Sequence, residues 1–442
     1  MVVKLKRIVI EHVKNVEYGS IDFTDGETFL NVTGIYGQNG SGKTTLVDVL
    51  DITRRVIQNY SLNDSYAGML SDKNDAHISI EIEELGKRII QYVFVLKKIR
   101  NSNDGYSVRV QEESVTTKIL EKYKTHRKLA HYRFESKEIV QFNISEKLAS
   151  QDALNIISDV SGDNRSSFLF SNSFKKLIKD SAKFLELDLV LSILRIFANN
   201  LRIYTSEYAG LISANIVAPV GIHYKDGDKD VHGLLPFHLR GSEGYIPKKM
   251  MGMYKKVIEQ MNTLLPEIIP NLSLKMYERD IRIDKNGEEE VRLEFLSVRD
   301  GKQFSLYYES DGVKKIIGLI GYLVEVYNKP DVIAVIDELD SGIYEYLLGE
   351  LIEVISTGAK GQLIFTSHNL RILEVLESNK VIFSTTNPEN RYIRMKGVKR
   401  SNNLRDMYLR TIQLGGQEES LYEGKSSTAL RISLMRAGVS DE

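Results

Sequence analysis

The octapeptide GQNGSGKT at residues 37–44 is the feature that most constrains the fold of this chain. It fits the pattern G-x-x-x-x-G-K-[ST], in which glycines let the backbone wrap so that successive N–H groups converge on phosphate oxygens. The apolar segment TFLNVTGIY precedes it as a buried strand should, and TTLVDVLDITRRVI follows with apolar residues at helical spacing. A strand, a glycine-rich loop and a helix in this order predict an α/β protein that binds a nucleoside triphosphate.

The side chains of this loop have separate tasks. Lys43 is placed to reach the β- and γ-phosphates, and the hydroxyl of Thr44 is suited to bind Mg²⁺. The sequence therefore predicts a phosphate-binding set that consists of Gly37, Asn39, Gly40, Ser41, Gly42, Lys43, Thr44 and Thr45.

Two carboxylates follow a second predicted strand far downstream. Residues 332–336, VIAVI, form a short apolar run that is typical of a buried parallel strand. Asp337 and Glu338 come at its carboxyl end, where open α/β sheets place their ligands. Asp337 is suited to hold Mg²⁺ through water, and Glu338 to act as general base toward the attacking water. The alternative for DELD at 337–340 is a solvated turn.

Two further positions are candidates. Residues 362–366 predict the next parallel strand, and His368 follows it, where an imidazole can contact the γ-phosphate and orient the water. A lone histidine is more often structural, but its place one strand–helix–strand unit after Glu338 favours the site. Ser310 and Gly312 precede a predicted helix whose capped start can bind an anion. The residues alone favour a plain capped helix there.

Taken together, the four elements resemble those of an ABC-type ATPase. The glycine-rich loop corresponds to Walker A, residues 310–312 to a degenerate signature, Asp337 with Glu338 to Walker B, and His368 to the switch histidine. ESDGVKKI, VIDELDSG, QLIFTSHNLRILE and the closing LRDMYLRTIQLGGQ look like motifs of OLD-like and SMC-like bacterial ATPases of anti-phage defence (abortive infection), such as the ATPase subunits of Rlo-type, PARIS or Septu systems. The chain departs from the pattern at the signature, which is not LSGGQ, and at Tyr344, where relatives often place histidine.

The resemblance and the patterns together predict the fold class. We expect an α/β P-loop NTPase of ABC-ATPase type, a mixed sheet flanked by helices, with an antiparallel β subdomain and a helical insertion. Residues 77–99 read as a hairpin that turns at Gly86, whereas the Gly-, Pro- and Asp-rich residues 217–247 read as loop. The expected units are an N-terminal lobe (1–110), a mostly helical insertion (111–270), a C-terminal lobe (271–400) and a tail (401–442).

The resemblance also implies a function. In ABC-type sites two subunits sandwich ATP and Mg²⁺, so Ser310 and Gly312 of one copy complete the site that Lys43 and the Walker B carboxylates form in the other. The expected protein is a homodimer, or a larger homo-oligomer, that controls a separate toxin or nuclease effector, since no E…DxD cluster follows His368. The alternatives are a SMC- or RecF-like DNA-repair ATPase and a nucleotide-gated scaffold with slow hydrolysis.

Composition narrows the remaining classes. The chain has no cysteine, which excludes disulfides and thiolate zinc sites and fits a cytoplasmic location. Its longest apolar run is too short to span a bilayer, so no membrane partner is expected. The formal net charge of −1 gives no overall attraction to nucleic acid, but residues 105–133 and 391–410 are rich in Lys and Arg. These segments are either contacts for DNA or an acidic partner, or a solvated, charge-balanced surface.

Overall fold

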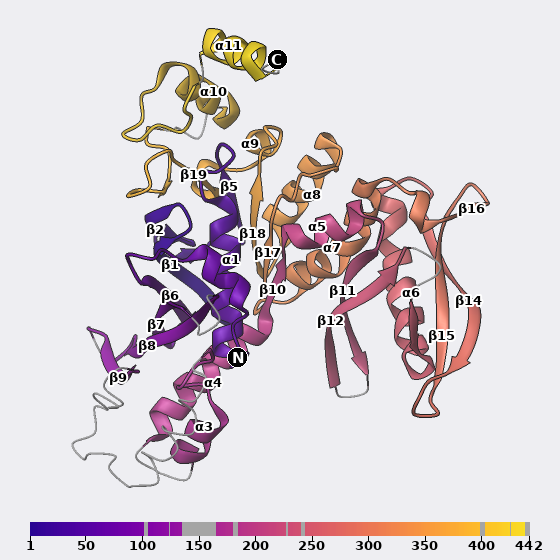
Figure 1. The fold of residues 1–442 in the computed structure, drawn as a ribbon, viewed down its shortest axis with the longest axis horizontal. Coiled ribbons are helices and arrows are strands. Elements are labelled where there is room, and N and C mark those ends of the chain that lie inside the picture. Colours follow the sequence, from indigo (N-terminus) through magenta and orange to yellow (C-terminus); the bar gives the residue numbers. More distant parts are fainter. Residues whose placement is uncertain are drawn as a thin grey trace.

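The computed structural model describes residues 1–100, 105–122, 124–134, 165–179, 184–226, 229–239, 244–397, 403–424 and 426–437 (Figure 1). A six-stranded sheet forms its centre, in the order β10-β17-β18-β5-β19-β20. The first five strands are parallel and β20 is antiparallel to β19. Their bounds are β5 Val32–Tyr36, β10 Leu201–Tyr204, β17 Ile333–Ile336, β18 Gln362–Ser367, β19 Val381–Ser384 and β20 Tyr392–Ile393. The predicted mixed sheet, with β17 and β18 as parallel neighbours, is confirmed.

The central sheet is buried on both faces, which explains why its strands read as continuous apolar runs. In β17, Ile333 and Val335 belong to one core cluster, whereas Ala334 and Ile336 belong to the other. Successive side chains of a strand point to opposite faces, so each strand serves both cores. The sheet therefore joins two hydrophobic cores.

The first core lies between the central sheet and a second, antiparallel sheet of order β2-β1-β6-β7-β8-β9. The hairpin predicted around Gly86 is confirmed, because β6 and β7 pair directly and Gly86 has a φ of 72°. Helices α1 and α4 fill the space between the sheets and pack on each other (Figure 1). The elements of this half are β1 Val3–Val13, β2 Val16–Asp22, β3 Thr24–Asp25, β4 Thr28–Phe29, β6 Ala76–Glu84, β7 Arg88–Arg100, β8 Tyr106–Ile119, β9 Arg127–Arg133, α1 Lys43–Ile57, α3 Asn172–Lys179 and α4 Leu185–Asn200.

The prediction of a mostly helical insertion over 111–270 is wrong for much of the described part. Strands β8 and β9 extend the antiparallel sheet, and β10 is an edge strand of the central sheet. Residues 217–238 form a hairpin, β11 Val217–Asp226 with β12 Lys229–His238, and not a loop. Helices in this range are α3, α4, α5 Ser206–Ser213 and α6 Met251–Ile268, and residues 135–164 lie outside the described residues.

The hairpin of β11 and β12, where the sequence predicts a loop, has a physical explanation. Ala218, Val220 and Ile222 alternate toward the second core, as strand residues do, although proline and glycine separate them. Pro219 pairs with Pro236 across a two-stranded ribbon, where a missing N–H is tolerated. Gly221 lets helix α7 (Asp311–Asn328) approach, since a Cβ on Gly221 would lie 2.7 Å from the Tyr322 ring, and a Cβ on Gly321 of that helix would lie 1.8 Å from the Gly221 carbonyl oxygen. The breaker residues here permit close packing instead of ending the strand.

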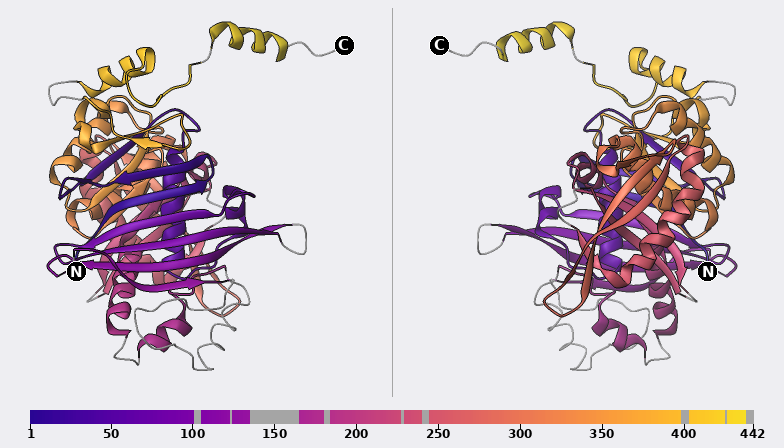
Figure 2. Two further views of the ribbon diagram at one scale, coloured as in Figure 1. Left: turned by 90° about the vertical axis from the view of Figure 1, so that its left-hand side faces the viewer. Right: turned by 90° about the vertical axis from the view of Figure 1, so that its right-hand side faces the viewer.

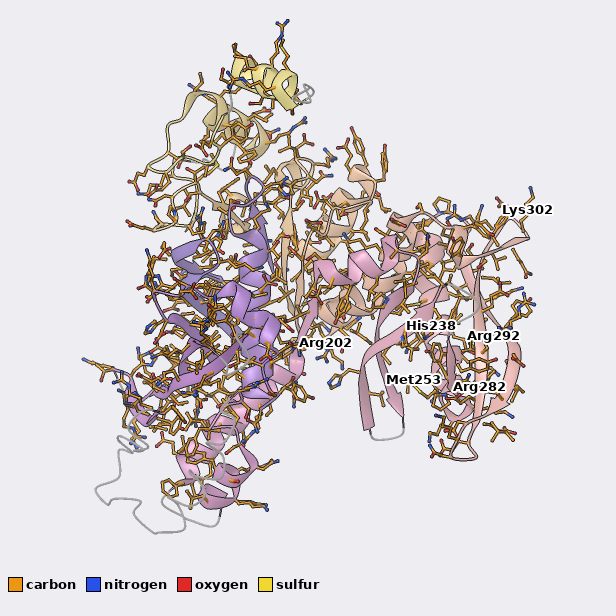
Figure 3. All side chains as sticks on the ribbon, viewed as in Figure 1. Arg202, His238, Met253, Arg282, Arg292 and Lys302 are labelled. Atoms are coloured by element: carbon orange, nitrogen blue, oxygen red, sulfur yellow. The ribbon has the colours of Figure 1, made fainter. Side chains whose placement is uncertain are left out.

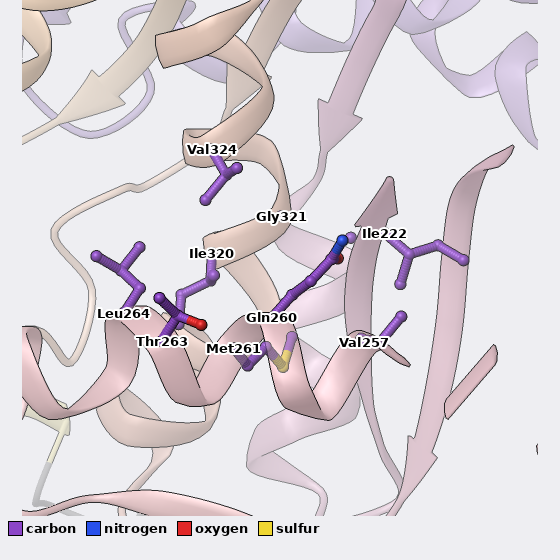
Figure 4. A pocket seen from close by; sticks show the side chains of 10 residues that line it. Ile222, Val257, Gln260, Met261, Thr263, Leu264, Ile320, Gly321 and Val324 are labelled. Atoms are coloured by element: carbon purple, nitrogen blue, oxygen red, sulfur yellow. The ribbon is translucent and has the colours of Figure 1, made fainter. Parts of the chain in front are cut away.

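The second core is formed by most of the remaining elements, whereas the C-terminal helix α11 buries no residue and stands away from the body (Figure 2). Helix α6 lies beside the antiparallel pair of β14 and β15. Helices α6 and α7 leave an apolar pocket of about 390 Å³ beside β11 (Figure 4). The bounds are β13 Tyr245–Pro247, β14 Ser273–Ile283, β15 Glu289–Arg299, β16 Lys302–Ser305, α7 Asp311–Asn328, α8 Glu345–Gly358, α9 Ile372–Val375, α10 Leu404–Leu414 and α11 Ser427–Ala437.

A buried ion pair ties the two halves together. Nε of Arg202 on β10 donates to Oε2 of Glu325 on α7 over 2.8 Å, and both side chains are less than a tenth exposed. Figure 3 labels Arg202, which lies between the two halves. A second nitrogen of the guanidinium donates to the other carboxylate oxygen over 3.3 Å, so the pair is bidentate.

Within the described part of the chain, none of the helices combines the length and the apolar character needed to cross a membrane.

Candidate functional site

A pocket of about 380 Å³ opens where β5, β17 and β18 end. These strands are parallel neighbours, so their carboxyl ends meet at one edge of the sheet. The residues that line the pocket are Lys14, Asn15, Asn39, Gly40, Gly42, Lys43, Thr44, Thr45, Glu338 and His368. The structure thus brings most of the predicted phosphate-binding residues together with Glu338 and His368, which lie about three hundred residues away in the sequence.

The glycine-rich loop has the backbone that its sequence predicts. Gly40 and Gly42 have φ angles of 78° and 89°, in the left-handed region that favours glycine. Gly42 precedes α1, and no described side chain caps this helix start, so its first N–H groups are available to an anion. Gly37 leaves no room for a side chain, because a Cβ there would lie 1.9 Å from Oγ of Ser384.

Lys43 is held inside the loop. Its Nζ donates to the carbonyl oxygens of Gly37 and Gln38, each over 2.9 Å, and the residue is 6% exposed. Burial lowers the pKa of Lys43, while the nearby carboxylates of Asp337, Glu338 and Asp340 oppose this shift. Among the described residues, the hydrogen bonds of this ammonium go to loop carbonyls and not to a carboxylate.

The residues proposed for Mg²⁺ fit such an ion. The Thr44 hydroxyl lies 3.4 Å from Oδ1 of Asp337, and that oxygen also accepts the hydroxyl of Thr366 over 2.6 Å. The other oxygen, Oδ2, is buried and has no hydrogen-bond partner among the described residues. An unpaired buried carboxylate oxygen beside a hydroxyl is the kind of hard oxygen ligand that Mg²⁺ prefers. No cluster of three or more His, Asp or Glu side chains that could hold a metal occurs in the described ranges, so phosphate oxygens and water would complete the coordination.

Glu338 lies in a strained turn. Its φ is 47°, a left-handed value that is uncommon for a residue other than glycine. Its N–H donates to the Thr366 hydroxyl over 2.7 Å, which fixes the backbone, while its exposed side chain lines the pocket. Strained backbone of this kind persists where the surrounding contacts over-determine it, and it is frequent at functional sites.

His368 faces the same pocket from the end of β18. Its backbone N–H donates to Oδ2 of Asp340 over 3.0 Å, which joins it to the turn after β17. Burial lowers the pKa of His368 from 6.5, and the positive charge of Lys43 lowers it further. The carboxylates of Asp340, Glu338 and Asp337 oppose this shift but do not cancel it. The imidazole is therefore mainly neutral at pH 7, with one nitrogen to donate and one to accept a hydrogen bond.

The structure does not bring Ser310 and Gly312 into this pocket. Ser310 is exposed and caps α7, with its hydroxyl accepting the N–H of Val313 over 3.3 Å. Gly312 packs on the turn after β17, where a Cβ would lie 1.8 Å from the carbonyl oxygen of Gly342. The signature residues therefore lie outside the pocket formed by one chain.

Several residues that support the loop were not found by sequence reasoning. Lys14 and Asn15, in the turn between β1 and β2, line the pocket. From the far end of the chain, Oγ of Ser384 lies 2.5 Å from Oγ of Ser41, and the Tyr392 hydroxyl donates to the Gly42 carbonyl over 2.6 Å. The Arg391 guanidinium donates to the backbone carbonyls of Asn15 and Thr385. No local motif marks these positions.

Some basic residues of both segments have partners within the chain. Arg391 and Arg394 donate to backbone carbonyls, whereas Lys396 pairs with Glu418 and Arg405 with Glu374. In the first segment Glu112 accepts from His131 and Arg133. Lys399 and Arg400 lie outside the described residues. The ion pairs of Lys396, Arg405 and Arg133 balance part of the positive charge of the two segments.

The chain has distant likeness to solved ATPase structures. It resembles the SMC head domain from Thermotoga maritima (16% identity, TM-score 0.39, covering 89% of this chain and 99% of that one). It also resembles the Smc head domain with a coiled coil and joint from Pyrococcus yayanosii (10% identity, TM-score 0.41, 93% and 100%). A third is the recombination mediator protein RecF of the RecFOR pathway (14% identity, TM-score 0.34, 85% and 94%). No curated protein matches the chain.

One family model matches most of the sequence. It is described as "AAA domain, putative AbiEii toxin, Type IV TA system" and matches residues 32–374, from the strand before the glycine-rich loop to the helix after His368. The match spans every predicted site residue. The chain therefore belongs to this family of AAA domains.

Proposed function

We propose that this chain is the ATP-binding and ATP-hydrolysing subunit of a bacterial anti-phage (abortive infection) system. In this proposal two copies sandwich ATP and Mg²⁺, and the closed dimer controls a separate toxin or nuclease effector. The observation that carries the dimer is the division of the site. Lys43, Thr44, Glu338 and His368 line one pocket, whereas Ser310 is exposed outside it at the capped start of α7.

The defence role rests on the family. Its description names a toxin and a toxin–antitoxin system, which supports a two-component arrangement in which this chain works with another protein. The ion pairs of Lys396 and Arg405 offset part of the positive charge of residues 391–410, which supports a protein partner over duplex DNA as the main ligand. The DNA-repair alternative predicts instead that DNA stimulates hydrolysis.

The proposed chemistry follows from the positions of the side chains. Lys43 would exchange the carbonyls of Gly37 and Gln38 for the β- and γ-phosphates, while the exposed N–H groups at the start of α1 bind the same oxygens. Thr44 and Asp337 would hold Mg²⁺, which neutralises the charge that develops on the phosphates. Glu338 would orient a water molecule on the γ-phosphorus and accept its proton as the bond to the β-phosphate oxygen breaks. Neutral His368 would donate to a γ-phosphate oxygen, and Ser310 of the second copy would bind the opposite side.

A mixing experiment tests the shared site. Lys43→Ala and Ser310→Arg variants are each expected to lose ATP hydrolysis. When they are mixed, a heterodimer contains one site with an intact Lys43 and an intact partner Ser310, so hydrolysis should return to about a quarter of the wild-type rate. A mixture that stays inactive while each variant remains folded would contradict the shared site.

Two further measurements test the rest of the proposal. Glu338→Gln with saturating ATP should sediment or scatter light as a dimer, whereas the same protein without nucleotide should be smaller. Adding duplex DNA should leave the hydrolysis rate within about two-fold of its basal value, and a larger stimulation would favour the repair alternative. Co-expression with the reading frame next to this gene would identify the effector, if nucleotide changes the complex that forms.

A further inference from the structure

Two adjacent lysines on α7 are buried, although lysine is rarely buried without a partner. Lys314 and Lys315 are 1% and 3% exposed. A buried ammonium is costly unless it donates to nearby acceptors, so each of these side chains must have a specific partner. Their partners differ.

The Lys315 ammonium reaches the turn that carries Glu338. Its Nζ donates to the backbone carbonyl oxygen of Glu338 and, over 3.2 Å, to that of Ser341. The same Glu338 carbonyl accepts the Ser341 N–H over 3.0 Å. Lys315 therefore bridges both ends of the four-residue segment 338–341 from the helix packed beside it.

This segment needs such support. Glu338 has a left-handed φ of 47° and Gly342 one of 76°, so the chain reverses direction within a few residues. On one side the Thr366 hydroxyl holds the Glu338 N–H, and on the other Lys315 holds the Glu338 carbonyl. The direction of the Glu338 side chain follows from this fixed backbone, because a change in φ and ψ would swing the carboxylate away from the pocket.

We propose that Lys315 is a positioning residue for ATP hydrolysis, which holds the backbone of Glu338 so that its carboxylate faces the attacking water. The inference rests on the proposed function, in which Glu338 is the general base. The inference gives α7, the helix that Ser310 caps, two roles. Its Lys315 supports the general base of its own chain, while its N-terminus faces the ATP that the second copy binds. The ammonium itself lines no part of the pocket and does not touch ATP in this role.

Lys314 provides a matched control. It is as deeply buried and lies on the same helix, but its Nζ donates to Oδ1 of Asn215 over 2.5 Å and lies 3.7 Å from Oδ1 of Asp311. Neither contact is with segment 338–341. Removing either ammonium should perturb the packing of α7 to a similar degree, whereas only the Lys315 change should disturb the turn of Glu338.

The experiment compares ATP turnover and ATP affinity for the full-length wild type and the variants Lys315→Met, Lys315→Gln and Lys314→Met. For Lys315→Met we expect kcat to fall by about ten- to a hundred-fold, because misplacing a catalytic group by an ångström has an effect of this size. The KM for ATP and the affinity for a non-hydrolysable ATP analogue should change by less than about two-fold, since the residues that bind phosphate are untouched. Lys314→Met should keep kcat within about two-fold of the wild type.

Two outcomes would overturn the inference: a kcat for Lys315→Met within about two-fold of the wild type, or an equal loss in Lys314→Met. If Lys315→Met does not fold, Lys315→Gln replaces it in the same measurements of kcat and ATP affinity, because its shorter amide cannot reach both carbonyls. The Glu338→Gln variant separates this inference from the proposed function. If Glu338→Gln hydrolyses ATP normally, the proposed base is wrong, whereas a dead Glu338→Gln beside an active Lys315→Met refutes the positioning role alone.

Discussion

Thr366 donates its side-chain hydroxyl to Oδ1 of Asp337 over 2.6 Å, and the same hydroxyl accepts the backbone N–H of Glu338 over 2.7 Å. One buried oxygen at the end of β18 thus orients both carboxylates that follow β17. The two strands are parallel neighbours with Ile336 beside Phe365, so Thr366, within β18, comes next to Asp337, the residue after β17. The geometry of the candidate Mg²⁺ ligand and of the candidate base depends on this one side chain.

Replacing Thr366 with valine removes the hydroxyl at nearly constant volume. We expect kcat for ATP to fall by about ten-fold or more, because a buried N–H and a carboxylate oxygen each lose a partner. The Mg²⁺ concentration for half-maximal hydrolysis should rise, since Asp337 is no longer held in place. Thr366→Ser keeps the hydroxyl and should stay close to the wild type. A Thr366→Val variant with wild-type kcat and Mg²⁺ dependence would show that the hydroxyl is dispensable.

Ser384 connects the end of β19 to the glycine-rich loop. Its Oγ lies 2.5 Å from Oγ of Ser41 and 3.0 Å from the Tyr36 carbonyl oxygen that it donates to. Ser384→Ala should weaken ATP binding by about three- to ten-fold, because loss of a buried hydrogen-bond partner costs about 1 kcal/mol or more. Titration calorimetry in the Glu338→Gln background measures this without turnover. Ser297, equally buried on β15, is the control, and Ser297→Ala should leave ATP affinity unchanged.

The part of the candidate site that is contiguous in the chain can be predicted from the sequence alone. Residues 37–44 are consecutive, so their pattern specifies the local backbone, and the apolar strands before Asp337 and His368 place these residues at the same edge of a parallel sheet. Ser384, Tyr392 and Lys14 reach the loop through tertiary contacts that no local pattern encodes.

The fold was predictable to a similar extent. The central sheet and the hairpin at Gly86 follow from apolar runs and strict alternation. The prediction of a loop at 217–238 is wrong because Pro219, Gly221 and Pro236 are typical of loops when only the local sequence is considered. In the structure they lie in a two-stranded ribbon that packs closely on α7, and only the packed helix explains why glycine is needed there.

Gly312 joins the start of α7 to the turn after β17. Its Cα has no room for a side chain, because a Cβ would lie 1.8 Å from the Gly342 carbonyl oxygen, and backbone cannot rotate away as a side chain can. Gly312→Ala should lower the free energy of unfolding by about 1–3 kcal/mol and reduce hydrolysis. Gly252 on α6 has open space around it, so Gly252→Ala should be neutral or slightly stabilising. Equal thermal unfolding of Gly312→Ala and the wild type would contradict this contact.

The lowered pKa of His368 gives a pH dependence with a defined sign. Because the folded-state pKa lies below the ordinary 6.5, the free enzyme holds a neutral imidazole at pH 7 and protonates it only on further acidification. Between these two pKa values the unfolded chain binds more protons, so His368 makes the folded state less stable as the pH falls below 6.5. If a neutral imidazole is needed in the pocket, kcat/KM should decline as the pH falls through the lowered folded-state pKa.

The His368→Asn variant isolates this effect, because asparagine keeps a donor and an acceptor but does not titrate there. We expect a lower kcat/KM at pH 7.5, by about ten-fold or more, and a flatter profile between pH 5 and 7 than the wild type has. Thermal unfolding of the variant should also depend less on pH in this range. Glu338 is present in both proteins, so the ratio of the two profiles removes its contribution and leaves that of the imidazole. A ratio that does not change with pH would mean that protonation of His368 has no part in hydrolysis.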